Sequence, residues 1–214
     1  GIAESQRQLY LGTINKSAGR QAGKEMARLL NNQGKVAVFA GVFTGDNNAS
    51  ERYDGIQEAF NGTEIELLPP YEDNVDFTVA YNNVEQAIAT HADLSGIITI
   101  WAYNGPEAAR AIQALGKEDE IKIVAFDMEP ETIAFLDEGI ISAAVAQRPY
   151  WMGYLSVYIL YSMDVLGAEQ TKNILSPWLT GDNDDIFDTG IDLVTSDNLE
   201  IYRDYLELLG ISSS

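Results

Sequence analysis

Short apolar runs alternate along the chain with longer stretches in which apolar residues recur every three or four positions. The runs predict buried strands and the stretches predict helices. The predicted strands are Leu9–Thr13, Lys35–Gly41, Glu64–Leu68, Gly96–Trp101, Ile121–Phe126, Ser142–Ala146 and Gly190–Thr195. The predicted helices start with one that Ser17 caps and Gly34 ends, followed by Asn48–Phe60, Asp76–Thr90, Pro106–Leu115, Pro130–Glu138, Tyr150–Leu166 and Asn198–Leu209.

The predicted strands are apolar at nearly every position rather than at every second one. This pattern is typical of a parallel sheet that helices cover on both faces. We therefore predict an α/β fold with a parallel, doubly wound sheet. Within the predicted helix Tyr150–Leu166, the strongly apolar stretch Trp151–Met163 is shorter than the ~20 residues of a membrane span, so a buried helix is expected there.

Composition narrows the classes of function. The 33 acidic and 13 basic residues give a net charge of −20, which repels phosphate backbones, so no nucleic-acid partner is expected. The absence of cysteine excludes thiol catalysis and thiolate zinc sites. The only histidine, His91, lies at a predicted helix end and is assigned a structural role. The acidic loop Asp182–Asp185 with Asp188 lacks the glycine and terminal glutamate of an EF-hand, so calcium is disfavoured and neither metal nor cofactor is expected.

Polar side chains follow successive predicted strands, at the edge where ligands bind in open α/β sheets. One loop leads to Arg52, the next passes Asp73, and later strands are followed by Asn104, Asp127 and Gln147. Guanidinium, amide and carboxylate groups form paired hydrogen bonds, which suit the neighbouring hydroxyls of a sugar or polyol. Three further residues near these strand ends are either ligand contacts or ordinary packing: Trp101, Tyr103 and Arg148.

The same positions carry a family resemblance that covers nearly the whole chain. The matching stretches are LGTINKSAGRQAG, ASERYDGIQEAF, IWAYNGPEAARAI, VAFDMEPETIAFLDEG, SAAVAQRPYWMGY and DTGIDLVTSDN. In their order and spacing the chain resembles bacterial periplasmic sugar-binding proteins of ABC transporters, of the ribose- and galactose-binding type. Members of that family have two α/β lobes that close around one sugar.

The resemblance implies specific ligand contacts. Four side chains are expected to bind sugar hydroxyls, namely Arg52, Asn104, Asp127 and Gln147, and Tyr103 joins them as a candidate. Where the family places an aromatic ring before an acidic residue, this chain has Val75 before Asp76. Val75 is therefore kept as a ligand-facing candidate, and its small side chain predicts a smaller, altered or differently oriented ligand.

The resemblance also implies a division of the chain. Residues 1–15 are expected to be the last strand of a first lobe, and residues 16–148 the second, sugar-binding lobe. Residues 149–180 would return to the first lobe, and residues 181–214 would hold a hinge, the final strand of the second lobe and a C-terminal helix. Since most of a first lobe is missing, we expect a longer natural protein or a second chain that supplies it.

The favoured function is the substrate-binding component of an ABC-type sugar transporter, with a permease as partner and no catalysis. Its expected location is periplasmic or extracytoplasmic, and a removed signal peptide or a lipid anchor outside the chain is left open. A sugar-sensing effector domain of a regulator or sensor kinase is the alternative. A sugar-modifying enzyme would need a carboxylate pair such as Asp127 with Glu107 or Glu129. Both glutamates lie in first helical turns, where acidic residues complement the helix dipole.

Overall fold

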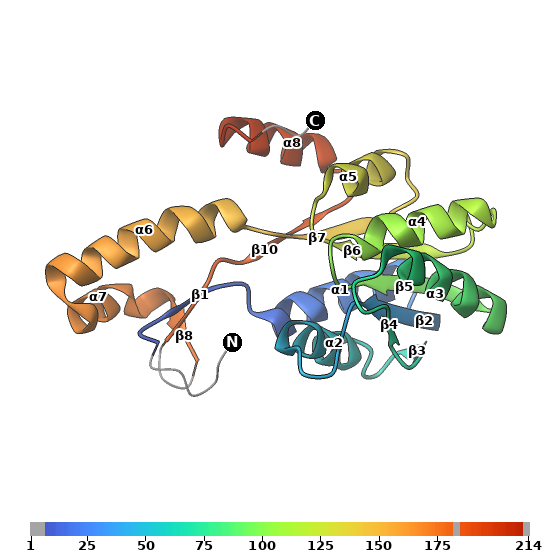
Figure 1. Ribbon diagram of the computed structural model, residues 1–214, viewed down its shortest axis with the longest axis horizontal. Coiled ribbons are helices and arrows are strands. Elements are labelled where there is room, and N and C mark those ends of the chain that lie inside the picture. Colours follow the sequence, from blue (N-terminus) through green and yellow to red (C-terminus); the bar gives the residue numbers. More distant parts are fainter. Residues whose placement is uncertain (1–6, 182–184, 212–214) are drawn as a thin grey trace. The chain divides into compact units, whose positions relative to one another are not determined.

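The computed structural model describes residues 7–181 and 185–211 (Figure 1). The chain divides into two compact units, and each is described by itself. The larger unit consists of Asn15–Ala146 and Leu193–Ser214, and the smaller unit of Gly1–Ile14 and Gln147–Asp192. The chain therefore passes from one unit to the other three times.

A sheet whose strands differ in length forms the centre of the larger unit. Its strands are β2 (Gln33–Ala40), β3 (Glu64–Leu67), β4 (Tyr71–Glu72), β5 (Leu94–Thr99), β6 (Lys122–Phe126), β7 (Ala143–Gln147) and β10 (Ile191–Val194). Their order is β10-β7-β6-β5-β2-β3, and β4 pairs with the end of β2. The pairings from β3 through β2, β5 and β6 to β7 are all parallel. Since parallel strands end at a common edge, the loops after β2, β4, β5 and β6 meet there.

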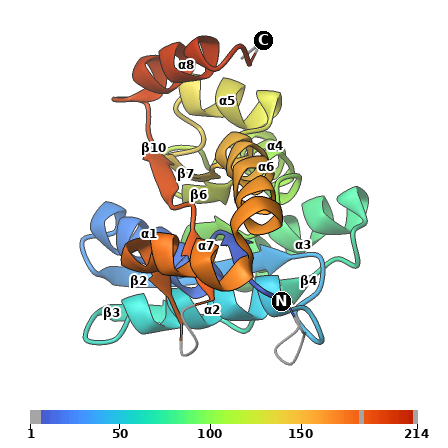
Figure 2. The same ribbon diagram turned by 90° about the vertical axis from the view of Figure 1, so that its left-hand side faces the viewer.

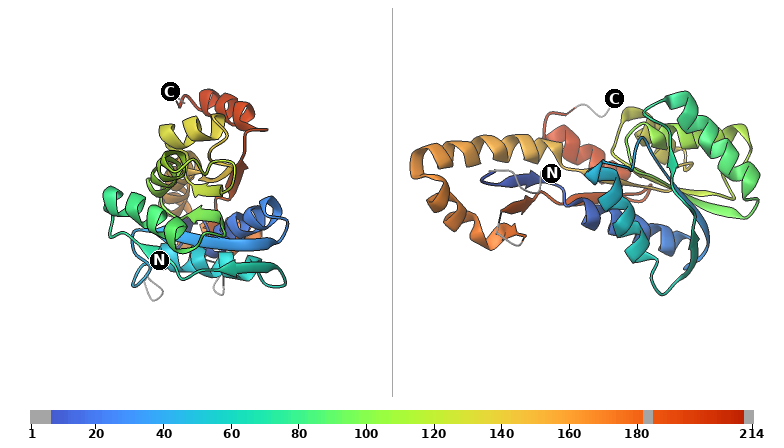
Figure 3. Two further views of the ribbon diagram at one scale, coloured as in Figure 1. Left: turned by 90° about the vertical axis from the view of Figure 1, so that its right-hand side faces the viewer. Right: turned by 60° about the horizontal axis from the view of Figure 1, so that its bottom comes forward.

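Helices cover both faces of this sheet. They are α1 (Asn15–Leu29), α2 (Asn47–Ala59), α3 (Phe77–Thr90), α4 (Asn104–Ala114), α5 (Pro130–Asp137) and α8 (Leu199–Leu208). Figure 3 shows α1 on one face and α3 and α4 on the opposite face. Strand β6 is accordingly buried from Ile123 to Phe126 on both of its sides. The predicted parallel, doubly wound α/β fold is confirmed.

Helices α1 and α2 approach each other closely because glycines face the contact. A Cβ atom on Gly19 would lie 1.9 Å from the carbonyl oxygen of Arg52, and one on Gly55 would lie 2.1 Å from that of Lys16. Neither position can therefore hold a larger residue without a backbone shift. The contact fixes the backbone of α2 at Arg52.

The described part of the smaller unit contains a three-stranded sheet and two helices. Strands β1 (Tyr10–Gly12) and β9 (Ile186–Asp188) are parallel, and β8 (Leu179–Thr180) pairs antiparallel with β9. The helices are α6 (Pro149–Leu166) and α7 (Ala168–Leu175), drawn in orange in Figure 2, and the 3-10 turn η1 (Ser176–Trp178) follows them. Helix α7 and strands β8 and β9 were not predicted, because elements this short carry too few residues for a periodic pattern.

The expectation of a buried helix at Tyr150–Leu166 is wrong for the described structure. Ile159 is the only residue of α6 that is buried, while Val157, Leu160 and Tyr161 are each about two-thirds exposed. The reason is geometric: α6 is apolar on all sides, and the described part of the smaller unit offers one small sheet and α7 to cover it. No helix among the described residues has both the length and the apolar character of a membrane span.

Two smaller expectations also change. Ser17 does not cap its helix, because α1 begins two residues earlier at Asn15, whose side chain bonds to Glu51 and Asn48 of α2. Residues 182–184 of the acidic loop lie outside the described residues. Of its other acidic residues, Asp185 pairs with Arg7, and Asp188 accepts hydrogen bonds from the backbone of Gly190 and Ile14. Among the described residues, no group of three or more His, Asp or Glu side chains could hold a metal.

Candidate functional site

Arg52 is the largest fully buried side chain of the described structure, with 1% of its surface exposed. It projects from α2 toward the ends of the central strands. Its Nη1 donates a hydrogen bond of 2.8 Å to the carbonyl oxygen of Ile100, and its guanidinium carbon lies 4.3 Å from the centre of the Phe126 ring. These contacts hold the guanidinium in one place, directly beyond β5 and β6, and keep it in a low-dielectric setting where each donated bond is strong.

Asn104 begins α4 and is also buried, with 1% of its surface exposed. Its Nδ2 donates a 2.7 Å hydrogen bond to Oδ2 of Asp73, a carboxylate that follows β4 and is itself 1% exposed. Asp73 also accepts from the backbone N–H of Val75 at 2.9 Å and from the hydroxyl of Tyr103. The sequence places Asp73 on a strand-end loop, but its contacts with Tyr103 and Asn104 were not predicted. The available signal was an aspartate in the loop that follows the predicted strand Glu64–Leu68.

Tyr103 is held on three sides. Its hydroxyl donates to Asp73, and Phe77 stacks on its ring with centroids 4.7 Å apart and an interplanar angle of 14°. Trp101 meets the ring edge-on at 6.5 Å. Burial raises the pKa of the Tyr103 hydroxyl well above its usual value, and the neighbouring carboxylate of Asp73 raises it further. The hydroxyl therefore stays protonated and remains a donor toward Asp73.

Trp101 has a packing role of its own. Its Nε1 donates to Oδ1 of Asn48 at 3.2 Å, and its ring lies where a side chain on Gly41 would stand, since a Cβ there would be 2.0 Å from the ring. The indole thus covers the end of β2. Trp101 was expected to be either a ligand contact or a packing residue, and these contacts give it a packing role.

Asp127 directly follows β6 and has a left-handed backbone, with φ of +67°. Its N–H donates to the carbonyl oxygen of Val145 at 3.0 Å, which prolongs the pairing of β6 with β7 by one residue. Left-handed backbone is uncommon outside glycine and is tolerated best by Asn and Asp. The chain therefore turns sharply at Asp127 with a short acidic side chain at the edge of the sheet, and this side chain is only partly buried.

Val75 also has a left-handed backbone, with φ of +64°, and it is 57% exposed. A β-branched residue in this conformation is a genuine outlier. The loop is held in this shape because the N–H of Val75 binds Asp73 and Asp76 caps α3 through Thr78 and Val79. Val75 consequently presents a small apolar side chain to solvent beside the Phe77–Tyr103 stack.

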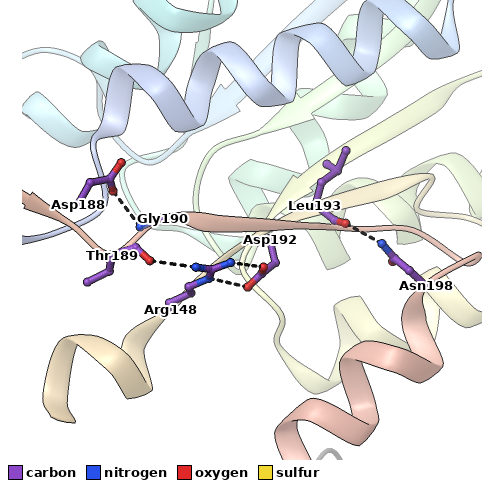
Figure 4. A network of polar contacts seen from close by, with 7 residues as sticks. All are labelled: Arg148, Asp188, Thr189, Gly190, Asp192, Leu193 and Asn198. Carbon is purple, nitrogen blue, oxygen red and sulfur yellow. Dashed lines mark hydrogen bonds and ion pairs between the residues drawn. The ribbon is translucent and has the colours of Figure 1, made fainter. Parts of the chain in front are cut away.

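Gln147 and Arg148 lie where β7 leads into α6. Gln147 is the last residue of β7 and the first residue of the smaller unit. Arg148 binds Asp192 through two hydrogen bonds, Nε to Oδ2 at 2.9 Å and Nη2 to Oδ1 at 2.6 Å. Its Nη1 reaches the carbonyl oxygen of Thr189 at 3.4 Å, as Figure 4 shows. Arg148 thus links the segment around residue 148 to the segment 189–192. Each segment lies next to a point where the chain passes between the two units.

The carboxylates considered for catalysis have other partners or positions. Glu107 in the first turn of α4 pairs with Arg110 at 2.5 Å, and burial raises the pKa of its carboxyl. Glu129 is exposed and precedes α5, where it takes the N-cap position. Glu107 therefore has a local partner, whereas the side chain of Glu129 makes no capping hydrogen bond to α5.

Most of the expected residues are thus brought to one edge of one sheet. Arg52 reaches the ends of β5 and β6, Asp127 follows β6, and Asp73 ties Tyr103, Asn104 and Val75 into a single cluster. A cavity of about 310 Å³ lies elsewhere, in the smaller unit, where apolar residues such as Tyr158, Ile174 and Trp178 line it. That cavity contains none of the expected residues.

Comparison with known proteins agrees with this geometry. The family model described as "Periplasmic binding protein domain" matches residues 2–168. The ribose import binding protein of Haemophilus influenzae is 27% identical over 157 residues, which are 73% of this chain and 53% of that protein. This chain therefore spans about half the length of that relative.

Solved structures extend the similarity. An arabinose-binding protein from Geobacillus stearothermophilus is 31% identical, with a TM-score of 0.77 over 92% of this chain and 66% of that one. An ABC transporter solute-binding protein from Burkholderia graminis, solved in complex with D-arabinose, is 29% identical, with a TM-score of 0.79 over 93% of this chain and 65% of that one. These relatives are binding proteins, which confirms the expectation of a non-catalytic chain. The chain belongs to the periplasmic binding protein domain family, as its strand-end residues suggested.

Proposed function

We propose that the chain is the greater part of the substrate-binding component of an ABC-type sugar transporter. In this proposal it binds a monosaccharide or polyol without changing it, works outside the cytoplasmic membrane and delivers its ligand to a permease. Residues 16–148 with the final strand form the sugar-binding lobe, and residues 1–15 and 149–180 belong to the other lobe. The ligand contacts are Arg52, Asn104, Asp127 and Gln147, with Tyr103 and Val75 beside them.

The observation that carries the proposal is the fixed position of the Arg52 guanidinium. Arg52 is buried, and its orientation is set by the carbonyl oxygen of Ile100 and the ring of Phe126. Its planar guanidinium, which carries only N–H donors, therefore lies at the ends of β5 and β6. Asp127, which accepts hydrogen bonds, follows β6 at the same edge. A sugar hydroxyl both donates and accepts, so a donor-only and an acceptor-only group set side by side suit adjacent hydroxyls.

The relatives support the same class of ligand. One is named for ribose import, one for arabinose binding, and one was solved with D-arabinose. None of these three names describes a regulator or a sensor. Ribose and arabinose are pentoses that differ in the orientation of single hydroxyls, so they form the natural first panel.

The test compares two aspartates that flank the same strand. The chain is mixed in turn with D-ribose, D- and L-arabinose, D-xylose, D-galactose and D-fucose, and binding is followed by saturation-transfer NMR, which detects millimolar affinities. Asp127→Asn should weaken binding of the preferred sugar at least tenfold, because Asn tolerates the left-handed backbone but has half the acceptor capacity. Asp119→Asn should leave it unchanged, since exposed Asp119 lies near the other end of β6.

Each outcome has a definite meaning. Loss of binding in Asp127→Asn alone supports the proposed site. Equal binding by both variants removes Asp127 from it. Failure of every sugar to bind the unmodified chain, in a sample whose NMR spectrum shows it folded, contradicts the proposal for this part of the protein.

A further inference from the structure

Asp73 is one of the few buried carboxylates of the described structure, and three donors surround it. The side chain is 1% exposed, and its backbone N–H donates to the carbonyl oxygen of Ala40 at the end of β2. Its Oδ1 accepts from Val75 and Tyr103, and its Oδ2 accepts from Asn104. A carboxylate has oxygens alone to offer, so it fixes which atom each neighbour must turn toward it.

This requirement decides the orientation of the Asn104 amide. The Nδ2 group must face Asp73, since the amide oxygen would meet a carboxylate oxygen there. Oδ1 of Asn104 therefore points elsewhere, and it is buried without a hydrogen-bond partner among the described residues. A buried acceptor that lacks a partner is unfavourable, so an arriving donor forms its bond there without displacing another group.

The same requirement applies to Tyr103. Its hydroxyl hydrogen is directed to Asp73, so any second bond at this oxygen must be one that it accepts. The ring cannot turn away freely, because Phe77 stacks on one of its faces and Trp101 meets its edge. At Oδ1 of Asn104 and at the hydroxyl oxygen of Tyr103, any further hydrogen bond must therefore be one that the protein accepts.

We propose that Asp73 is a positioning residue that sets the direction of hydrogen bonding in the site: it turns the Asn104 amide so that Oδ1 receives a hydroxyl that donates. This proposal rests on the proposed function for the nature of the ligand. Asp73 itself does not touch the ligand. It acts through Asn104 and Tyr103, whose oxygens are left to accept from the ligand, whereas Arg52 can only donate.

The first test replaces the carboxylate of Asp73 with an amide. In Asp73→Asn the new amide donates where the carboxylate accepted, so the Asn104 amide has to turn over and direct Nδ2 to the ligand. Binding of the preferred sugar should fall about ten- to hundredfold, the range for leaving a buried hydrogen-bonding group unpaired. Asp76→Asn in the same loop is the matched control, because Asn caps helices as well as Asp does, and it should leave binding unchanged.

The double variant Asp73→Asn/Asn104→Asp separates positioning from a purely structural role. Here the amide at position 73 donates to a carboxylate at position 104, and the other oxygen of that carboxylate again accepts from the ligand. The proposal expects the double variant to recover most of the lost affinity. A double variant that folds but binds as weakly as Asp73→Asn would show that an acceptor oxygen at position 104 does not restore binding, and this overturns the proposal.

Monofluoro analogues of the preferred sugar give a second readout, since C–F cannot donate. One analogue, fluorinated at the hydroxyl that meets Asn104, should bind the unmodified chain much more weakly than the parent sugar. In Asp73→Asn the difference between parent and analogue should shrink. An unchanged difference in Asp73→Asn contradicts the proposal.

A third readout needs no sugar. The side-chain amide of Asn104 should be protected from hydrogen exchange in the unmodified chain and exposed to it in Asp73→Asn, while that of Asn48 stays the same. If no sugar binds, the proposed function fails, but hydrogen exchange of the Asn104 amide still decides whether Asp73 orients Asn104. Rapid exchange in the unmodified chain would overturn the positioning role by itself.

Discussion

Arg148 and Asp192 face each other in a bidentate ion pair, with hydrogen bonds of 2.9 and 2.6 Å. Both lie in the smaller unit, one residue or less from points where the chain passes to the larger unit. The guanidinium also reaches Thr189, and a Cβ on Gly190 would lie 3.2 Å from its Nη1. The pair thus links Arg148, the N-cap residue of α6, to Asp192 in β10, so these two crossing segments are joined by a side-chain ion pair.

Asp192→Asn should destabilise the smaller unit modestly. The two side chains are 38% and 32% exposed, so solvent screens the pair and its loss should cost about 0.5–1 kcal/mol. Urea unfolding at low and high salt measures this, and the difference from the unmodified chain should diminish in high salt. Asp137→Asn, which removes a single long contact of 3.4 Å to Arg203, is the control with no expected effect. A loss in Asp192→Asn that is equally large in high salt would refute the electrostatic account.

Val75→Asn should stabilise the chain. Valine pays for its left-handed φ of +64° with steric strain, whereas Asn adopts this backbone readily, and the relief is worth about 1 kcal/mol. The hydrogen bond from the backbone N–H to Asp73 stays in place. The urea midpoint should therefore rise, whereas the same substitution at exposed Val157 in α6 should not raise it. A lower midpoint in Val75→Asn would mean that the side chain packs usefully where it stands.

In Tyr103→Phe, the free energy of unfolding should depend less on pH in the alkaline range. The folded protein raises the pKa of Tyr103 through burial and the bond to Asp73, while in the unfolded chain the pKa is about 10. Above pH ~10 the unfolded state therefore loses this proton first, and the stability that Tyr103 contributes declines as the pH rises. The variant lacks this contribution. Denaturation curves between neutral and strongly alkaline pH measure the difference, and parallel curves for both proteins contradict the shift.

The arrangement of strands and helices could be read from the sequence because each central strand is a continuous apolar run. Lys35–Gly41 and Ile121–Phe126 were predicted to within two residues of β2 and β6 at each end. The exposure of α6 could not be read, because an apolar helix looks the same whether or not another part of the protein covers it. The role of Asp73 could not be read either, since its partners Tyr103 and Asn104 lie about 30 residues away and meet it only in the folded sheet.

Gly19→Ala should destabilise the larger unit, whereas Gly153→Ala should stabilise the smaller one. The new methyl group at Gly19 would overlap the Arg52 carbonyl at 1.9 Å, and forced overpacking costs about 1–3 kcal/mol or more. Gly153 lies exposed in α6 with no atom near its Cβ position, so alanine there should gain about 0.5–1 kcal/mol from helix propensity. Thermal and urea unfolding of both variants give the two signs. Equal effects would contradict the close contact of α1 with α2.

The glycine contact between α1 and α2 also bears on how mutational surveys of this chain would look. Gly19 has no polar atom beyond its backbone, yet any side chain added there pushes directly on the residue that carries the Arg52 guanidinium. A survey that scores ligand uptake would therefore rank Gly19 among the ligand contacts, although it never meets the ligand. Substitutions would therefore reduce ligand binding at residues that hold the site in place as well as at residues that contact the ligand.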